Sequence, residues 1–359
     1  FFKQKTAYEI YQCDWSSDVC SSDLDLEVRV LALLAARLLD EAGFPPELWQ
    51  VVSGTGPEVG GAVVAAADYV CFTGSTATGR LIARQCADRL VGCSLELGGK
   101  NPMLVLRDAD VHRAAEGAVR AVFSNAGQLC VSMERLYVAD QVYDRFVDAF
   151  VARTQAMTLG ASHDWNVDMG SLISQAQLDT VTAHVEDAVA KGATVLAGGR
   201  ARPDLGPFVF EPTVLEGVSV DMECFGKETF GPVVSLYRFH SEDEAIARAN
   251  DGHYGLNASV YTRDTARGRA VARRIRCGTV NVNEAYGATF GSLSAPMGGM
   301  RESGMGRRQG AEGVLRYTEA QSVATQRLVP IAPMFGMSEE TNAKVMTQAL
   351  RLLNKLGRA

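Results

Sequence analysis

Two patterns of apolar residues alternate along most of the chain, a helical period near 3.6 residues and short runs rich in β-branched residues. The helical pattern covers residues 26–41, 77–90, 110–123, 141–156, 174–191, 242–250 and 264–275. The short apolar runs cover residues 49–54, 68–74, 93–97, 102–106, 134–138, 193–197, 232–239, 256–262 and 278–282. Strands and helices that alternate at this spacing are typical of βαβ units. The sequence therefore predicts an α/β fold with a mostly parallel sheet.

The two ends of the chain depart from this pattern. Residues 1–24 show neither helical nor strand periodicity and lack the features of a signal peptide, so we interpret them as a head that is foreign to the fold or disordered. Residues 338–357 predict a capped amphipathic helix, with Glu339 and Glu340 at its start and Lys355 at its end. Its apolar face is expected to dock on its own domain or on a sister subunit.

Composition narrows the class of protein. The 359 residues are 47% hydrophobic and 21% charged, with a net charge of −7, which is ordinary for a globular protein of about two domains. This acidic balance argues against nucleic-acid or membrane partners, and no apolar run reaches the ~18–20 residues that span a bilayer. Eight scattered cysteines without a C-x-x-C pair indicate reduced thiols in the cytoplasm, and five dispersed histidines give no support for a metal site.

Two glycine-containing loops each follow a predicted strand. The first, residues 54–60 (GTGPEVG), resembles a dinucleotide-binding fingerprint with its third glycine one residue late, and a plain turn explains it equally well. The second, residues 72–80 (FTGSTATGR), lies between a strand and a helix. Its glycines allow the backbone to approach a ligand closely, and the start of the helix favours a phosphate.

Four further motifs follow in a fixed order: residues 95–102 (LELGGKNP), 123–130 (FSNAGQLC), 227–232 (KETFGP) and 296–307 (PMGGMRESGMGR). Together they resemble the aldehyde dehydrogenase superfamily, over residues 25 to about 328. The resemblance implies that residues 25–98 are part of a parallel nucleotide-binding sheet and residues 99–316 an α/β catalytic domain. It also implies that residues 317–328 add an edge strand across a subunit interface, as in a homodimer or homotetramer.

The resemblance assigns catalytic roles to Cys130 and Glu96. A thiolate can add to an aldehyde carbonyl, and the resulting thiohemiacetal can release hydride to a nicotinamide, which leaves a thioester. A carboxylate at Glu96 can then activate the water that hydrolyses this thioester. Because a cysteine attacks as its thiolate, we expect an electropositive or amide-rich environment around Cys130. The alternatives are an inert core thiol for Cys130 and a structural ion pair for Glu96.

The family also implies a bound NADP or NAD. The residues that match its cofactor-binding motifs are Gly74, Ser75, Gly79, Leu97, Glu228 and Phe230. Gly74 and Ser75 are expected near the pyrophosphate, the Leu97 backbone near the nicotinamide amide, and Glu228 at the nicotinamide ribose. The alternative for the stretch that contains Glu228 is a turn that begins a strand.

Within the superfamily, the chain is most similar to bacterial NADP-dependent succinate-semialdehyde dehydrogenases, which implies succinate semialdehyde as substrate. One departure concerns specificity, because many such enzymes have an arginine six residues before the catalytic cysteine and this chain has Ser124. Ser292 and Ser294 are candidate hydroxyl partners for the substrate carboxylate, although surface serines are the more common explanation.

A second departure concerns the start of the chain. The family's substrate-polarising asparagine and the lysine segment that binds the adenosine ribose lie upstream of anything in this sequence, which implies an N-terminal truncation. Loss of one oxyanion donor costs about 10²–10³-fold in rate. Three alternatives stay open: a non-catalytic subunit that retains the fold, an aldehyde dehydrogenase for a different aldehyde, and an enzyme that passes the acyl group to coenzyme A, against which Glu96 argues.

Overall fold

A computed structural model describes residues 22–52, 54–161, 166–327, 332–333 and 335–357. The chain divides into two compact units at Tyr317 and Thr318. The interpretation of residues 1–24 as a foreign head lies outside the described residues, apart from residues 22–24, which begin helix α1 (Ser22–Glu41). The boundary expected at residues 98 and 99 falls inside the first unit, where the chain passes from one sheet to another.

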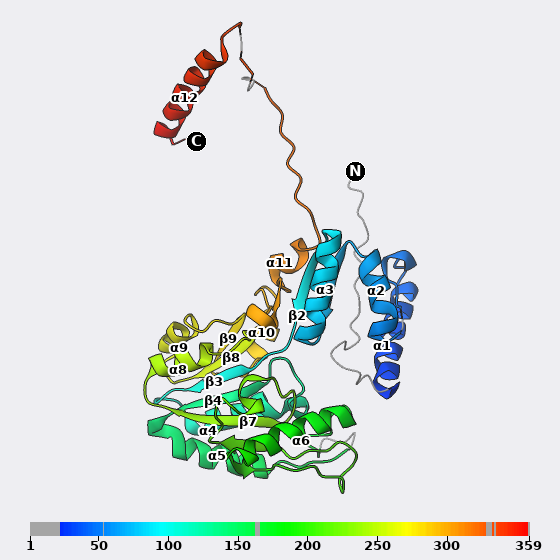
Figure 1. Cartoon of the computed structure of the whole chain (residues 1–359), viewed down its shortest axis with the longest axis vertical. Helices are drawn as coiled ribbons and strands as arrows, with labels where there is room; N and C mark the ends of the chain where they lie inside the picture. Colours follow the sequence, from blue (N-terminus) through cyan, green and yellow to red (C-terminus); the bar gives the residue numbers. More distant parts are fainter. Residues whose placement is uncertain (1–21, 53, 162–165, 328–331, 334, 358–359) are drawn as a thin grey trace. The chain divides into compact units, whose positions relative to one another are not determined.

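The larger sheet of the first unit has seven strands in the order β5-β6-β7-β4-β3-β8-β9 (Figure 1). Its strands are β3 (Asn101–Val105), β4 (Met133–Ala139), β5 (Thr194–Ala197), β6 (Thr213–Glu216), β7 (Val233–Phe239), β8 (Asn257–Tyr261) and β9 (Thr279–Val282). All neighbours pair in parallel except β5 and β6. The mostly parallel α/β fold predicted from the sequence is confirmed.

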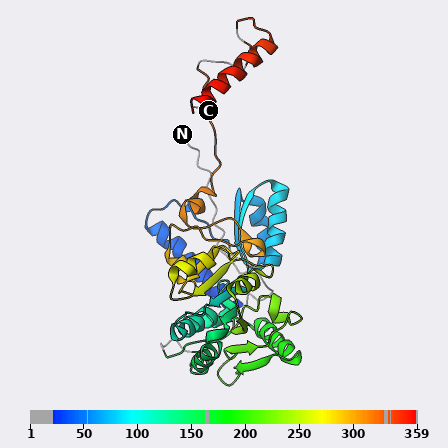
Figure 2. The ribbon, with the colours of Figure 1, turned by 90° about the vertical axis from the view of Figure 1, so that its left-hand side faces the viewer.

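Helices cover both faces of this sheet, with α4 and α5 on one side and α8 and α9 on the other (Figures 1 and 2). The helices of this part are α4 (Val111–Phe123), α5 (Tyr143–Gln155), α6 (Gln175–Ala190), α7 (Glu223–Gly226), α8 (Glu242–Asn250), α9 (Thr265–Ala272) and α10 (Gly287–Gly291). Short 3-10 turns are η2 (Ser124–Gly127) and η3 (Asp140–Val142). Stacked rings of Phe123, Phe146 and Phe150 fill the space between α4 and α5, which explains the apolar period of both helices.

The smaller sheet has three strands, β1 (Tyr69–Thr73), β2 (Gly92–Glu96) and β10 (Gly304–Met305), in that order. β1 and β2 are parallel, and β10 is antiparallel to β2. The elements around it are η1 (Pro46–Leu48), α2 (Gly56–Ala66), α3 (Thr76–Arg89), η4 (Arg301–Ser303) and α11 (Gly310–Leu315). A segment near the end of the first unit thus pairs with Glu96, more than two hundred residues upstream.

One predicted strand was wrong. Among the described residues of 49–54 none is in a strand, and β1 is an edge of the small sheet, so this run has no ladder to join. Instead, Thr55 and Glu58 form a reciprocal capping box that starts α2. The first glycine loop is therefore the start of a helix, fixed by its cap and by a proline in the first turn.

The second unit contains one helix, α12 (Glu339–Lys355), in the described part of residues 318–359. The Ser338 hydroxyl accepts a hydrogen bond from the Thr341 N–H and caps this helix. Residues 318–327 are neither helix nor strand in the single chain. Because an edge strand needs a neighbour to pair with, the strand expected at 317–328 stays a prediction for an assembly.

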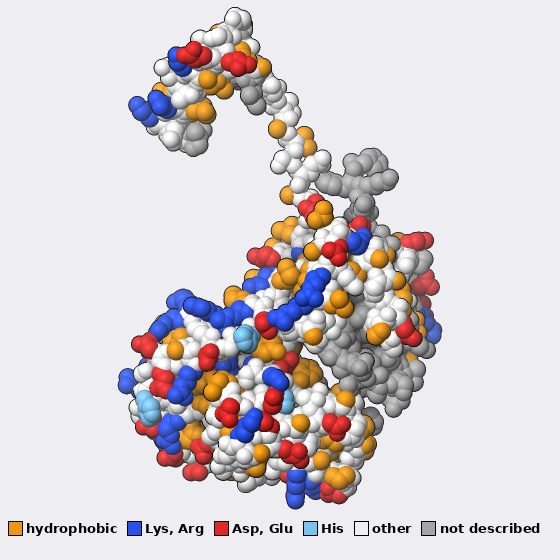
Figure 3. Space-filling model, in the orientation of Figure 1, with side chains coloured by type: hydrophobic (Ala, Val, Ile, Leu, Met, Phe, Trp, Pro, Cys, Tyr) orange, Lys and Arg blue, Asp and Glu red, His pale blue; other side chains and the backbone are white. Residues whose placement is uncertain are grey.

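Charged side chains of both signs are interspersed over the face of the first unit that Figure 3 shows. None of the helices within the described residues is long and apolar enough to cross a bilayer.

Candidate active site

Cys130 lies in a loop that the end of α4 and the turn η2 introduce. Asn125, Ala126 and Gly127 all have positive φ values, of 52°, 53° and 71°. At Gly127 a Cβ atom would lie 2.1 Å from the Gly231 carbonyl oxygen, so only glycine allows this close approach. The cysteine loop therefore packs directly on the backbone of the loop that contains Glu228.

Asn101 anchors the same loop from the first residue of β3. Its amide Nδ2 donates to the carbonyl oxygens of Cys130, at 2.8 Å, and Ser132, at 2.7 Å. Its Oδ1 accepts from the Asn257 N–H at 3.0 Å, so the buried side chain connects three segments. Asn101 has no role predicted from the sequence, although it lies in the LELGGKNP motif.

Glu96 ends β2 beside this loop. Its backbone carbonyl accepts from the Gly74 N–H at 3.0 Å, and β10 pairs with it through Gly304. The side chain is only 7% exposed, and its Oε1 has no hydrogen-bond partner among the described residues. Burial raises the pKa of Glu96 to about 7, against the opposing effect of nearby arginines. These arginines are Arg308, Arg316 and Arg307.

The electrostatic setting of Cys130 differs from the sequence prediction. Burial raises the pKa of its thiol to about 11, and the carboxylates of Glu228 and Glu96 act in the same direction. Arg308 favours the thiolate but does not outweigh them. The electropositive half of the expectation is therefore wrong, because desolvation and two nearby carboxylates both disfavour a negative sulfur, whereas the amide-rich half stays a prediction.

Glu228 lies against the two glycines that follow Glu96. Its Oε1 accepts from the Gly99 N–H at 2.7 Å. A Cβ atom on Gly98 would lie 2.1 Å from Glu228 Oε2, so this glycine makes room for the carboxylate. Phe230, two residues further, is partly buried and has a φ of 50°. The structure thus brings Cys130, Glu96, Glu228 and Phe230 into one site.

Helix α3 starts two residues after Gly74, whose N–H donates to the Glu96 carbonyl. The Ser75 hydroxyl accepts from the Thr78 N–H and caps the helix, and Gly74 follows β1. Gly79 lies against Leu97, where an added Cβ would come within 2.6 Å of the leucine side chain. Glycine at this position lets the helix close on the strand end, as in dinucleotide-binding folds. Direct cofactor contacts of Gly74, Ser75, Gly79 and Leu97 stay predictions.

Ser292 and Ser124, the two serines discussed for the substrate carboxylate, each use their hydroxyl in a local hydrogen bond. Ser292 is exposed, and its hydroxyl donates to the Ala288 carbonyl at 2.8 Å. The Ser124 hydroxyl donates to the Arg120 carbonyl at 2.7 Å and so serves the end of α4. Tyr286, which the sequence analysis gave no role, packs with Cys130 on the apolar cluster of Val131, Leu256 and Met297.

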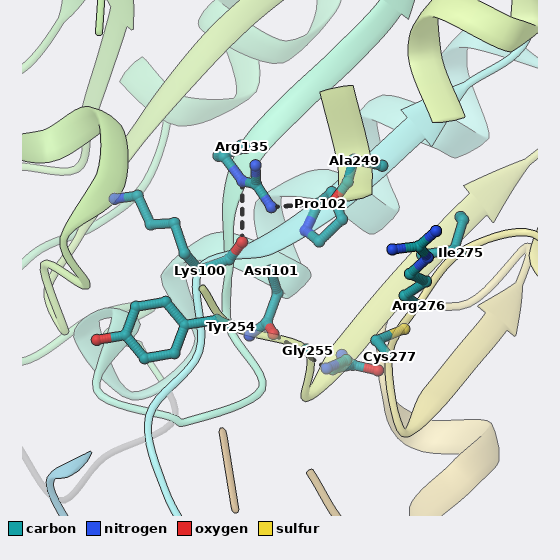
Figure 4. Close-up of a pocket in the computed structure, with 11 residues that line it drawn as sticks. Lys100, Asn101, Pro102, Arg135, Ala249, Tyr254, Gly255, Ile275, Arg276 and Cys277 are labelled. Carbon is teal, nitrogen blue, oxygen red and sulfur yellow. Dashed lines mark hydrogen bonds between the residues drawn. The ribbon is translucent and has the colours of Figure 1, made fainter. Parts of the chain in front are cut away.

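A small polar pocket is lined in part by Asn101, which anchors the Cys130 loop (Figure 4). Arg135 is buried there and donates to the carbonyl oxygens of Lys100 at 2.9 Å and Ala249 at 3.2 Å. Lys100 and Asn101 line the pocket, but Cys130 and Glu96 do not. We interpret it as a structural pocket behind the site. In the described part of the chain no group of three His, Cys, Asp or Glu side chains could hold a metal ion.

The chain is similar to known proteins over most of its length. The model of the aldehyde dehydrogenase family matches residues 25–323, and the chain therefore belongs to this family. It is 54% identical over 332 residues to a Mycolicibacterium smegmatis protein named "Putative succinate-semialdehyde dehydrogenase", with NADP(+) in the name, covering 92% of the chain. It is 38% identical to the 2-aminomuconic semialdehyde dehydrogenase of Danio rerio, covering 83% of the chain and 62% of that protein.

Among solved structures, an NAD+ complex of an aldehyde dehydrogenase from Bacillus cereus matches with a TM-score of 0.77 and 41% identity. The match covers 81% of this chain and 59% of that one. The chain spans 64% of the length of the Mycolicibacterium relative. The resemblance seen in the four motifs is thus confirmed at the level of the family.

Proposed function

We propose that this chain oxidises an aldehyde to its carboxylic acid with NADP+ or NAD+, using Cys130 as the nucleophile and Glu96 as the general base. The observation that carries the proposal is the buried Glu96 carboxyl, whose pKa is raised to about 7, electrostatically coupled to the Cys130 thiol. A general base is most effective when its pKa is close to the working pH. A structural ion pair would instead lower the pKa of a carboxyl group.

The residues present fit a nicotinamide nucleotide. Gly98 and Gly99 leave space for the Glu228 carboxylate, which can accept hydrogen bonds from ribose hydroxyls. The capped start of α3 after Gly74 suits a phosphate group. The bound nucleotide supplies the hydride acceptor of the reaction. Relatives named for NADP+ and a neighbour in complex with NAD+ support both coenzymes.

The chain's own residues then perform the remaining steps. Cys130 adds through sulfur to the aldehyde carbon, and its thiol proton must leave, since the thiolate is the nucleophile. After oxidation the acyl group is held on Cys130 as a thioester. Glu96, ionised above pH of about 7, takes a proton from water, and the resulting attack releases the carboxylic acid and restores the thiol.

We infer three finer points, which concern the substrate, the assembly and the location of the protein. Succinate semialdehyde is the proposed substrate, because relatives at 50–54% identity carry that name. A homodimer or homotetramer is proposed because residues 317–328 resemble the family's oligomerisation segment, and residues 318–327 are neither helix nor strand in the single chain. A cytoplasmic location is proposed because the six cysteines with described positions are free thiols.

The test is a rapid-mixing assay of NADPH formation with succinate semialdehyde, using the purified chain. We expect Cys130→Ala to abolish the signal. We expect Glu96→Gln to keep a burst of up to one NADPH per chain and to lose steady turnover, since acylation precedes the step that needs the base. If Cys130→Ala keeps the wild-type rate, or if wild type gives no NADPH or NADH with any aldehyde, the proposal fails.

A further inference from the structure

The loop that contains Glu228 rests on a buried ion pair outside the reacting groups. Lys100 Nζ and the Glu134 carboxylate form this pair, and their side chains are 5% and 3% exposed. Among the ion pairs of the described residues, both partners are so deeply buried only here. Burying two charges costs free energy that their attraction seldom recovers in full. A contribution to stability therefore does not by itself explain this ion pair.

The Glu134 carboxylate uses its oxygens on the loop backbone. Oε1 accepts from the Thr229 N–H and the Phe230 N–H, each at 3.0 Å, and Oε2 accepts from the Thr229 N–H at 2.9 Å. Thr229 is 1% exposed, and its hydroxyl lies 3.1 Å from His184 Nδ1. One carboxylate thus binds the two residues that directly follow Glu228.

Gln177 holds the same two residues from the other side. Its Nε2 donates to the carbonyl oxygens of Thr229 and Phe230, both at 2.9 Å. Phe230 has a φ of 50°, a conformation that a bulky residue adopts only when its surroundings impose it. The bonds from Glu134 and Gln177 impose it here. This conformation keeps Glu228 at 2.7 Å from the Gly99 N–H.

We propose that Glu134, neutralised by Lys100, is the positioning residue that holds Glu228 in place to receive the nicotinamide nucleotide. Lys100 directly follows Gly98 and Gly99, so the same pair ties both sides of the Glu228 cradle together. The part of this proposal that concerns the nucleotide rests on the proposed function, whereas the part that concerns the loop does not.

The test compares Glu134→Gln with Asp108→Asn as a matched control. Asp108 is also a carboxylate that accepts loop amides, those of Arg263 and Asp264, but at a turn that does not contain Glu228. A glutamine at 134 keeps the shape but offers one acceptor oxygen and places an amide group near Lys100. We expect hydrogen exchange of the Thr229 and Phe230 amides to accelerate at least about tenfold in Glu134→Gln only.

Nucleotide binding provides the second measurement. Fluorescence titration with NADPH is expected to show a dissociation constant raised about 10- to 100-fold in Glu134→Gln and unchanged in Asp108→Asn. If wild type binds NADPH and Glu134→Gln binds equally well, the proposal is overturned. If wild type binds neither NADPH nor NADH, the proposed function fails, and the amide exchange result alone decides whether Glu134 positions the loop.

A second variant covers the case in which Glu134→Gln does not fold, as judged by circular dichroism. Gln177→Ala removes the bonds to the Thr229 and Phe230 carbonyls from a partly buried helix position and leaves the ion pair intact. We expect the Thr229 and Phe230 amides to stay nearly as protected as in the wild type, because Glu134 still accepts from both. Loss of their protection and a weaker affinity for NADPH in Gln177→Ala would show that Gln177 and not Glu134 holds the loop, which would overturn the proposal.

Discussion

At the scale of single residues, burial raises the pKa of both Cys130 and Glu96. The Glu96 carboxylate adds to this effect at Cys130, whose thiol is still neutral at the pH where Glu96 titrates. Arg308 opposes this effect at both residues and is the strongest of the opposing cations at Glu96. The neutral thiol and the half-protonated carboxyl near pH 7 are therefore the resting state of the site.

The raised pKa of Glu96 has a consequence for stability. Its folded value of about 7 lies above the ordinary 4.5, so the folded chain holds a proton that the unfolded chain releases between these values. Stability should fall as pH rises from about 4.5 to about 7, by up to about 3 kcal/mol for this group. We expect Glu96→Gln to raise the unfolding temperature at pH 8 and to leave it unchanged near pH 4.5. Equal unfolding temperatures at pH 8 would contradict this assignment.

Reactivity of Cys130 should follow the charges around it. We expect Glu228→Gln to lower the pKa of the thiol and Arg308→Gln to raise it, because each change removes one of the two strongest charges that act on the sulfur. The measurement is the pH dependence of alkylation by iodoacetamide, corrected with Cys130→Ala for the other free thiols. Profiles that move together in both variants would show that these charges do not control the thiol.

At the scale of elements, glycines determine how closely helices and loops approach the site. Gly79 lets α3 close on Leu97, and Gly127 lets the cysteine loop rest on the backbone at Gly231. Gly61 differs from these two glycines, because no close approach requires a glycine there. Gly61 in α2 has open space where its side chain would be, with no atom within 4 Å of a Cβ.

One substitution in two helices should therefore have opposite effects. Gly61→Ala should stabilise the chain by ~0.5–1 kcal/mol, since alanine favours helix and meets no neighbour. Gly79→Ala should destabilise it by ~1–3 kcal/mol, because the new Cβ would lie 2.6 Å from the Leu97 side chain. Urea unfolding of both variants and wild type measures the difference. A stabilised Gly79→Ala would show that Leu97 moves aside at no cost.

At the scale of the whole molecule, the chain separates into a compact unit that ends at Tyr317 and a second unit with α12. Tyr317 itself belongs to the first unit, where its hydroxyl lies 3.2 Å from the Cys71 sulfur and its ring packs edge-on against Tyr69. The apolar side of α12 carries exposed residues such as Leu350, Leu353 and Leu356. Because the first unit has a hydrophobic core of its own, we expect its stability not to depend on α12.

Removal of residues 336–359 tests this independence. We expect the unfolding temperature of the remaining chain, followed by circular dichroism, to stay within about 2 °C of that of the full chain. A larger fall would show that α12 docks on the first unit or on a second copy. Light scattering on both proteins separates these two outcomes, since only docking on a second copy changes the mass of the particle.

Local patterns were sufficient to predict most elements and the family of the chain. The period of 3.6 residues predicted most of the helices, because a helix buries one face. The short β-branched runs predicted most of the strands, because central strands such as β3, β4 and β8 are buried on both faces. The motifs around Glu96, Cys130 and Glu228 indicated the family before any contact was known. The run at 49–54 was wrongly predicted as a strand. A strand needs a neighbouring strand to pair with, and a local pattern does not show whether one is present.

What only the tertiary structure decided depends on contacts between distant segments. The pairing of β10 with Glu96, the Asn101 anchor under Cys130 and the Glu134 bonds to the Glu228 loop each join residues far apart in sequence. The thiol pKa could not be predicted either, since burial and the charges of Glu228, Arg308 and Glu96 act through space. The sequence determined which groups we propose to react, and the fold determined the electrostatic state in which they meet.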